Sequence, residues 1–509
     1  YQARLKRPAT GPIAAGMVAR RFLPLAALCA ALVACGSADE GAVDVALIGS
    51  PESVLTTSLR LSASAQHVRA ATQSGLVALN PQGETVPALA ERWIVTDDGR
   101  SFLFRLREGT WPDGSELTAA SARDALEDAI EGLEGTSLAQ DLAPVEEVRA
   151  MAGRVIELRL STPEPYLLQI LAQPELALRQ PGGETGPMTM EREGDAITLN
   201  FKPPLERGLP DDEEWQESVR EIRLHPLPAE EAIAMFDSGE AETVIGGTLG
   251  NFPLVETGPL SSGTLRLDTT YGLFGLQVRA DGGLLSNTGV REGLAMAIDR
   301  AALMARYNIS GWVPTTRPVS PGLPGDPGLV NERWVDQPIE ERREEAAARI
   351  SAWRAQFDEG DLSQPATISL AIGDAPGWEL LYRDLAAQLA TVGLRLERAE
   401  DARDADLVVV DRVARYPAPR WFLNQFHCSL GRGLCDENVD TLVEIALAET
   451  DPVARARTLA QAEAELTLAN VYIPIGAPLR WSLVRGSVDA FLPNPYAFHP
   501  LPEMAQIPR

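Results

Sequence analysis

A strict alternation of apolar and polar residues marks the clearest strand of this chain. Residues 101–107 read SFLFRLR, so that both Phe side chains and the second Leu fall on one face of an extended segment. This period of two is typical of a strand with one buried face. The turn residues 97–99 (DDG) separate this segment from the apolar stretch 93–96, and the two stretches are therefore predicted to form a β-hairpin.

A second periodicity, with apolar residues three and four positions apart, predicts helices. Thr118 is a suitable N-cap for a helix that extends to about residue 131. Residues 290–307 (VREGLAMAIDRAALMARY) predict one continuous helix, in which Asp299 is expected to serve as a capping or packing residue. Residues 87–92 (PALAER) predict a short helix. Further helices are predicted at 229–238, 338–357, 378–392, 438–449 and 452–468.

Predicted strands and helices alternate along most of the chain, which favours the α/β fold class. Residues 43–48 (VDVALI) and 405–411 (ADLVVVD) are nearly continuous apolar stretches, of the kind found in strands buried on both faces. A length of 509 residues is too large for one compact core. The sequence therefore predicts two or three lobes rather than a single domain.

Composition and charge exclude several classes of protein. The hydrophobic fraction of 45% and the charged fraction of 23% are those of an ordinary globular protein. They exclude a disordered chain, a collagen and a polytopic membrane protein. The 72 acidic residues outnumber the 45 lysines and arginines, and the formal net charge is −27. Because an acidic surface repels phosphate backbones, nucleic acid is a poor partner.

The amino-terminal segment has the features of an export signal. Arg20 and Arg21 precede a short apolar stretch, 22–34, which ends in Leu-Val-Ala directly before Cys35. This stretch is short for a bilayer span but suits a signal peptide, with a buried core helix as the alternative. The segment resembles a bacterial lipobox. We therefore expect residues 1–34, an upstream extension and the signal itself, to be removed and Cys35 to carry a lipid anchor.

Five segments, in order along the chain, carry a resemblance to a known family. The longest is 75–126, which contains the predicted hairpin, and 290–303 (VREGLAMAIDRAAL) lies in the long predicted helix. The others are 183–190 (GETGPMTM), 414–426 (ARYPAPRWFLNQF) and the C-terminal pieces 471–475 and 492–501. Together they resemble the extracellular solute-binding proteins of family 5, the oligopeptide-, dipeptide- and nickel-binding components of ABC importers.

The resemblance implies an α/β, two-lobed fold like that of periplasmic binding proteins of type II, with an extra domain and a ligand cleft between the lobes. Domain III would comprise 271–485, and an inserted domain II would comprise 61–180. Domain I would combine three separate segments, 36–60, 181–270 and 486–509. The chain would cross between the lobes near 270 and near 485, and these crossings would form the hinge.

The resemblance also implies which residues bind ligand. In peptide-binding members, the aspartate before the Tyr of an Asp-Tyr-x-x-Pro loop holds the α-ammonium group of the ligand, and here that position is Arg415. A tryptophan often stands three residues earlier, where this chain has Arg412. The loop residues Arg412, Arg415, Tyr416 and Trp421 are the expected ligand contacts. An arginine favours a carboxylate or phosphate, although Arg415 could instead pair with a neighbouring acid.

Two cysteines remain in the expected mature chain beyond Cys35. Cys428 and Cys435 flank the short loop SLGRGL, and in an oxidising compartment we expect them to form a disulfide. His427 invites a metal site as the alternative, but a fourth ligand at suitable spacing is missing. No metal and no cofactor are expected. The common motifs of hydrolases, zinc proteases and phosphate-binding loops are also missing, so the chain is not expected to be an enzyme.

The resulting hypothesis is a lipid-anchored substrate-binding protein of an ABC importer. It would bind a peptide, a peptide-like molecule or an anionic solute and deliver it to a membrane permease and its ATPase. We expect a monomer in the periplasmic space or on the outer face of a bacterial membrane. The alternative is a sensory or envelope-associated lipoprotein that uses the same scaffold without transport. A secreted hydrolase would need a nucleophile–base pair that the sequence does not display.

Overall fold

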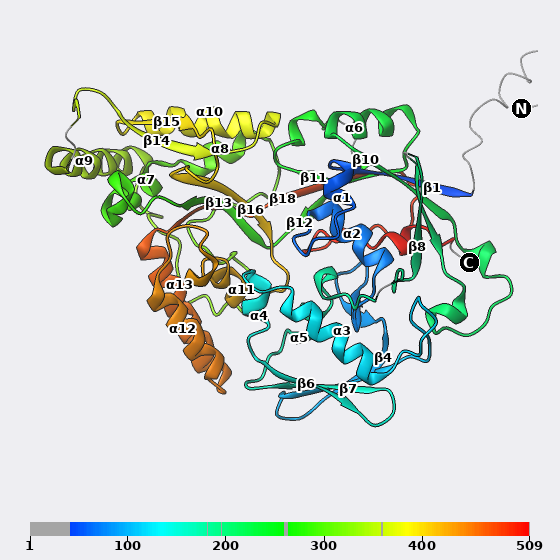
Figure 1. The fold of residues 1–509 in the computed structure, drawn as a ribbon. Coiled ribbons are helices and arrows are strands. Elements are labelled where there is room, and N and C mark those ends of the chain that lie inside the picture. Colours follow the sequence, from blue (N-terminus) through cyan, green and yellow to red (C-terminus); the bar gives the residue numbers. More distant parts are fainter. Residues whose placement is uncertain (1–40, 181, 195, 259–262, 358–359, 508–509) are drawn as a thin grey trace, which may run out of the picture. The chain divides into compact units, whose positions relative to one another are not determined.

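The computed structural model describes residues 41–509 except 181, 195, 259–262, 358–359 and 508–509. The expected signal segment and Cys35 lie outside the described residues. Ala42–Arg509 forms one compact unit that contains three main β-sheets (Figure 1).

A seven-stranded sheet contains the first described strand. Its strand order is β12-β18-β11-β1-β10-β9-β8. The central strand β1 runs parallel to β10 and β11, and the outer pairs are antiparallel. The strand bounds are β1 (Ala42–Ile48), β8 (Met188–Glu193), β9 (Ala196–Phe201), β10 (Glu221–Leu227), β11 (Thr243–Thr248), β12 (Leu265–Thr269) and β18 (Leu479–Val484).

Helices cover both faces of this sheet. Val45 of β1 packs in one apolar cluster with Val68 of α2 (Ala63–Thr72), whereas the next residue, Ala46, packs in another with Phe236 of α6 (Ala229–Ser238). Successive side chains of a strand point to opposite faces. The double burial explains why residues 43–48 are almost entirely apolar.

A five-stranded sheet has the order β15-β14-β16-β13-β17. Its central strands β16 and β13 are antiparallel, with Arg412 opposite Leu273. The bounds are β13 (Gly272–Val278), β14 (Ala366–Ala371), β15 (Leu394–Arg398), β16 (Leu407–Val413) and β17 (Tyr472–Gly476). The helices of this part are α7 (Thr288–Ala297), α8 (Arg300–Ala305), α9 (Ile339–Phe357), α10 (Pro376–Ala390), α11 (Pro419–Asn424), α12 (Glu437–Ala448) and α13 (Pro452–Ala469).

A four-stranded sheet contains the predicted hairpin, in the order β4-β5-β7-β6. The bounds are β4 (Ala90–Val95), β5 (Ser101–Leu106), β6 (Val145–Met151) and β7 (Val155–Leu160). Phe102, Phe104 and Leu106 are buried on one face of β5, as the alternation predicts. Thr118 caps α3 (Ala119–Glu131) by accepting a hydrogen bond from the backbone N–H of Ser121. Around this sheet lie α4 (Ser137–Asp141) and α5 (Leu167–Leu171), and the small pair β2 (Val77–Leu79) and β3 (Thr85–Pro87) precedes it.

Two predicted helices differ from the structure. Residues 87–92 are not a helix, because Ala90–Val95 is the strand β4 and pairs with β5, which places Trp93 opposite Phe104. Their Ala, Leu, Glu and Arg residues favour a helix locally, but cross-strand pairing outweighs this preference. The helix predicted at 290–307 is divided into α7 and α8, since Asp299 takes an extended conformation and caps α8 by accepting from the N–H of Ala302.

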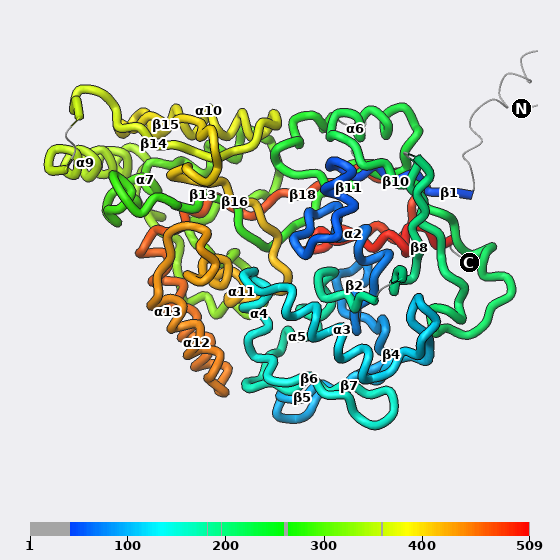
Figure 2. Tube along the Cα trace, in the orientation of Figure 1, coloured from blue at the N-terminus to red at the C-terminus, as the bar shows by residue number. Residues whose placement is uncertain are grey.

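The chain passes between the two larger sheets through short segments. One passage is 270–271, between β12 and β13, and the other is 477–478, between β17 and β18. Figure 2 shows β18, near the red end of the colour range, between β13 and β11. The first passage lies where the sequence predicts a crossing. The second precedes the expected crossing near 485, because β18 hydrogen-bonds to β11 and β12 in the seven-stranded sheet. The exact domain boundaries remain a prediction.

Candidate functional site

A cavity of about 560 Å³ is lined by segments from all three parts of the fold. Residues 411–415 at the end of β16 form one wall, together with α11 and the loop that follows it. Opposite segments come from the start of α2, from α4 and from residues 173–175. Arg480 of β18, residues 496–498 and the loop 59–62 before α2 also line it. A local sequence pattern can indicate one wall of such a site but not the distant segments that face it.

Arg412 lines this cavity from the end of β16, and its contact with a ligand stays a prediction. Its Nη1 donates a long hydrogen bond of 3.3 Å to Oε1 of Gln425. Burial lowers the pKa of the Arg412 guanidinium. Among the described residues, no carboxylate forms an ion pair with it.

Arg415 also lines the cavity, but its charge is compensated within the protein. Its Nη2 donates to Oε1 of Glu175 at 2.8 Å, and its Nη1 donates to the side-chain oxygens of Gln66 at 2.5 Å and Gln173 at 3.2 Å. The side chain of Glu175 is only 6% exposed, whereas that of Arg415 is 25% exposed. The geometry therefore corresponds to the alternative in which Arg415 pairs with a neighbouring acid.

The other two residues predicted to contact ligand lie in different environments. Trp421 of α11 is almost fully buried and lines the cavity. Tyr416 is fully buried and does not belong to the cavity lining. Its Oη donates to Oδ1 of Asp141 at 2.8 Å. Tyr416 therefore lies behind the wall of the cavity, where it holds the segment 414–418 against α4.

A buried polar network joins α4 to α11. Asp141 of α4 accepts hydrogen bonds from Tyr416 and from Asn424. Arg420 donates to the backbone oxygen of Asp141 and forms an ion pair with Glu164 at 2.5 Å, and both side chains of that pair are 5% exposed. Burial raises the pKa of Asp141 to about 7, although the charge of Arg420 opposes this shift. This network ties the five-stranded part of the fold to the four-stranded part.

Three arginines of the cavity escaped the analysis of the sequence, as did its acidic residues. Arg480 lies in β18 and forms an ion pair with Asp411 at 2.7 Å. Arg60 lies in the loop before α2, and Arg432 lies in the loop between the two cysteines. The position of Arg432 between two glycines of that loop was the only local signal available. Arg60 and Arg480 carry no local sequence signal.

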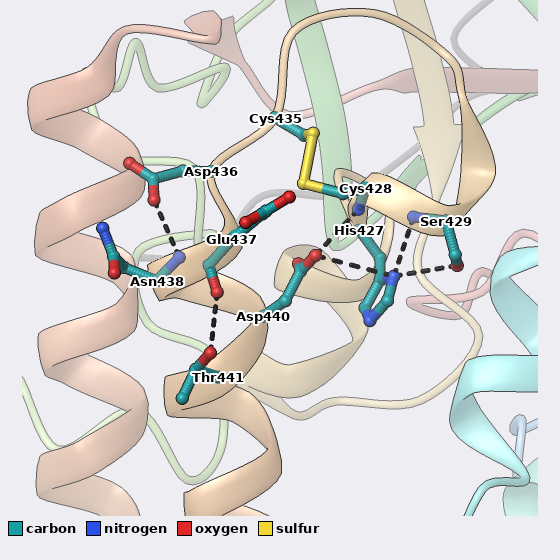
Figure 3. Close-up of a disulfide and its surroundings, with 9 residues drawn as sticks. All are labelled: His427, Cys428, Ser429, Cys435, Asp436, Glu437, Asn438, Asp440 and Thr441. Carbon is teal, nitrogen blue, oxygen red and sulfur yellow. Dashed lines mark hydrogen bonds and ion pairs between the residues drawn. A yellow bond between two sulfur atoms is a disulfide. The ribbon is translucent and has the colours of Figure 1, made fainter.

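A disulfide joins Cys428 and Cys435, whose Cα atoms are 5.2 Å apart (Figure 3). Oδ2 of Asp440, in α12, accepts a hydrogen bond from the backbone N–H of Cys428 at 2.9 Å and lies 3.7 Å from the ring of His427. These contacts attach the cysteine loop to the start of α12. The described residues include no group of three or more potential ligands that could hold a metal ion.

The geometry is that of a binding cleft with several charged groups.

Within the part of the chain that the structure describes, no helix is both long and apolar enough to cross a membrane.

Comparison with known sequences gives a match over most of the chain. The profile of the bacterial extracellular solute-binding proteins, family 5 Middle, matches residues 84–432. The periplasmic oligopeptide-binding protein OppA of Salmonella typhimurium is 22% identical over 472 residues, which cover 82% of this chain and 83% of OppA. The probable deoxycholate-binding periplasmic protein YgiS of Escherichia coli is 31% identical over 120 residues. That match spans only 20% of this chain and 22% of YgiS.

Comparison with solved structures gives the fold. OppA of Burkholderia pseudomallei matches with a TM-score of 0.78 at 19% identity, over 93% of this chain and 100% of that chain. The Escherichia coli murein tripeptide binding protein MppA matches with a TM-score of 0.77 at 16% identity, over 93% and 99% of the two chains. The chain therefore has the two-lobed α/β fold of periplasmic binding proteins of the OppA type, as the sequence predicts.

Proposed function

Because the chain belongs to the bacterial extracellular solute-binding proteins of family 5, we propose that it is the receptor of an ABC importer and delivers a solute to a membrane permease. Proteins of this family bind peptides or similar solutes and are periplasmic or extracellular. The observation that carries the proposal is the cavity of about 560 Å³ where separate parts of the fold meet. Ligand sites of two-lobed proteins occur at such junctions.

The solute that we propose is a peptide-like or anionic molecule. The position at which peptide-binding relatives place an aspartate is Arg415, which already holds Glu175. A free α-ammonium group would find no available carboxylate at this position, because Glu175 is already paired with Arg415. Arg412 and Trp421 supply a cation and an aromatic surface in the same cavity.

The location that we propose is the outer face of a bacterial membrane. Cys35, which lies outside the described residues, would carry the lipid anchor, and the mature receptor would act as a monomer with a permease and its ATPase. The segments 270–271 and 477–478 would form the hinge between the lobes, because within the described residues these two short connections link the strands of the two larger sheets.

The test combines binding with transport. The mature chain is incubated with a metabolite extract and washed, and the compounds released on denaturation are identified by mass spectrometry. The released compound should reduce the radius of gyration in small-angle scattering, because ligand binding closes the lobes. Its uptake should be lost in cells that lack the gene and restored by a plasmid copy. Binding without any change in uptake would favour the sensory alternative, and the absence of any bound compound would contradict a receptor.

A further inference from the structure

The cavity is basic although the protein is strongly acidic. Five arginines line it, against three acidic residues, within the described part of a chain whose formal net charge is −27. Arginines clustered in a concave site focus a positive potential there. The excess of positive charge is therefore confined to the cavity. The three acidic residues of the cavity are too few to compensate its five arginines.

Two of the five arginines are neutralised by the acids of the cavity. Arg415 pairs with Glu175 at 2.8 Å, and Arg480 pairs with Asp411 at 2.7 Å. The third acid, Asp141, is occupied by hydrogen bonds from Tyr416 and other groups of the wall. None of the three acids is left to compensate another cation.

Arg60, Arg412 and Arg432 remain without an acidic partner among the described residues. Nη1 of Arg432 is buried and has no hydrogen-bond partner. Burial lowers the pKa of Arg432 to about 10, and the nearby charges of Arg412 and Arg60 contribute to this shift. Arg432 is thus close enough to Arg412 and to Arg60 to be repelled by both, which costs free energy unless an anion lies near them.

The loop that carries Arg432 is held in place by several constraints. The Cys428–Cys435 disulfide closes it, and Gly431 adopts a left-handed conformation with φ of 58°. Gly433 lies so close to β13 that an added Cβ would stand 2.5 Å from the backbone oxygen of Val278. The N–H of Leu434 donates to that oxygen at 2.9 Å. A side chain on such a loop is preorganised, which reduces the entropy lost on binding.

We propose that Arg60, Arg412 and Arg432 form a site for a solute that carries at least two carboxylate or phosphate groups. This inference rests on the proposed function and specifies its substrate class. The planar guanidinium donates two parallel hydrogen bonds to a carboxylate or phosphate. Three uncompensated cations match a ligand with two or three negative charges, whereas a neutral solute could satisfy the N–H of Nη1 of Arg432 but would leave all three charges uncompensated.

Calorimetry with defined probes tests the site. Citrate represents the polycarboxylates and pyrophosphate represents the phosphates, with glycerol as the uncharged comparison. One of the two anions should bind, with an affinity that falls as salt is added. R412Q and R432Q should each weaken that binding at least about tenfold, because each removes charge-assisted hydrogen bonds. R403Q is the matched control, since Arg403 is a highly exposed residue outside the cavity and its loss changes the net charge equally.

The outcomes separate this inference from the proposed function. If the compound released from the extract-loaded protein carries two or more anionic groups and binds R412Q and R432Q more weakly than R403Q, the inference holds. If a neutral or cationic compound is released and its uptake depends on the protein, the receptor function stands and the inference is overturned. Equal binding of citrate or pyrophosphate by all three variants would show that these anions bind elsewhere and would also overturn it.

Discussion

The guanidinium of Arg415 donates a hydrogen bond through Nη2 to Oε1 of Glu175 over 2.8 Å. The two residues are 240 positions apart in the sequence, and the side chain of Glu175 is almost completely buried. A ligand carboxylate would therefore have to compete with Glu175 for this arginine. The pairing leaves Arg412, rather than Arg415, as the cation of the 411–426 segment that is available to a ligand.

The first prediction concerns this ion pair. R415Q should lower the free energy of unfolding by about 1–3 kcal/mol, because it leaves the buried carboxylate of Glu175 without its cation. Solvent around the partly exposed Arg415 screens the pair and keeps the loss below that of a fully buried ion pair. R415Q combined with E175Q should recover most of this loss, since no buried charge then remains unpaired. Urea unfolding of the two single variants and the double variant gives the coupling free energy. Additive losses would show that the two side chains do not interact in solution.

The second prediction concerns Asp141, whose pKa burial raises to about 7 from an ordinary value of 3.8. The folded state holds this proton more tightly than the unfolded state. The protonated carboxyl group of Asp141 therefore contributes fully to stability below about pH 4, and this contribution is lost as the pH rises through 7. Arg420, Glu164 and Tyr416 face the carboxyl group, and the Arg420 charge limits the loss. We expect a loss of about 2–4 kcal/mol, since one pKa unit corresponds to about 1.4 kcal/mol.

D141N is the control for this pH dependence. Its amide oxygen can still accept the hydrogen bonds from Tyr416 and Asn424, but it cannot ionise. Relative to D141N, the unmodified protein should lose unfolding free energy as the pH rises from 4 to 8. Burial also raises the pKa of Glu503 to about 7, but this group is present in both proteins and its effect cancels. A difference that does not change with pH would contradict the prediction.

The third prediction concerns the Cys428–Cys435 disulfide. The variant with both cysteines replaced by serine should lose about 2–3 kcal/mol of unfolding free energy, because a short closed loop restricts the unfolded chain. It should also bind anions more weakly, since the loop that carries Arg432 becomes less ordered. Urea unfolding and calorimetry with and without a reducing agent measure both effects. If the reduced and oxidised proteins have the same unfolding free energy and the same anion affinity, the predicted effects on stability and on binding are both wrong.

The fourth prediction concerns Cys35, which follows the apolar stretch at the amino terminus. C35A should leave the protein with its leader attached or release it from the membrane, because neither the lipid nor the cut before this residue can form. Membrane fractionation and the mass of the intact protein report the outcome. C29S, which changes a cysteine within the leader, is the matched control and should be processed normally. Membrane recovery and a mature mass in C35A that equal those of C29S would refute the lipid anchor.

Patterns with a short repeat made the local elements predictable. The alternation in 101–107 corresponds to β5, and the apolar stretch 43–48 corresponds to β1, because a period of two or a continuous apolar run depends only on which faces are buried. The segment 87–92 shows the limit of such patterns. Its residues favour a helix in isolation, and its pairing with β5 decides the conformation.

The site was only partly predictable. Motif comparison predicted four ligand contacts: Arg412, Arg415, Tyr416 and Trp421. All except Tyr416 line the cavity, and contact with a ligand stays a prediction. Only the tertiary structure decides which arginine is free to bind an anion, because Arg415 meets its partners Gln66 and Glu175 across 349 and 240 positions of the chain. The charge of a guanidinium follows from the sequence, but its compensation depends on which distant carboxylates the fold brings within hydrogen-bond distance.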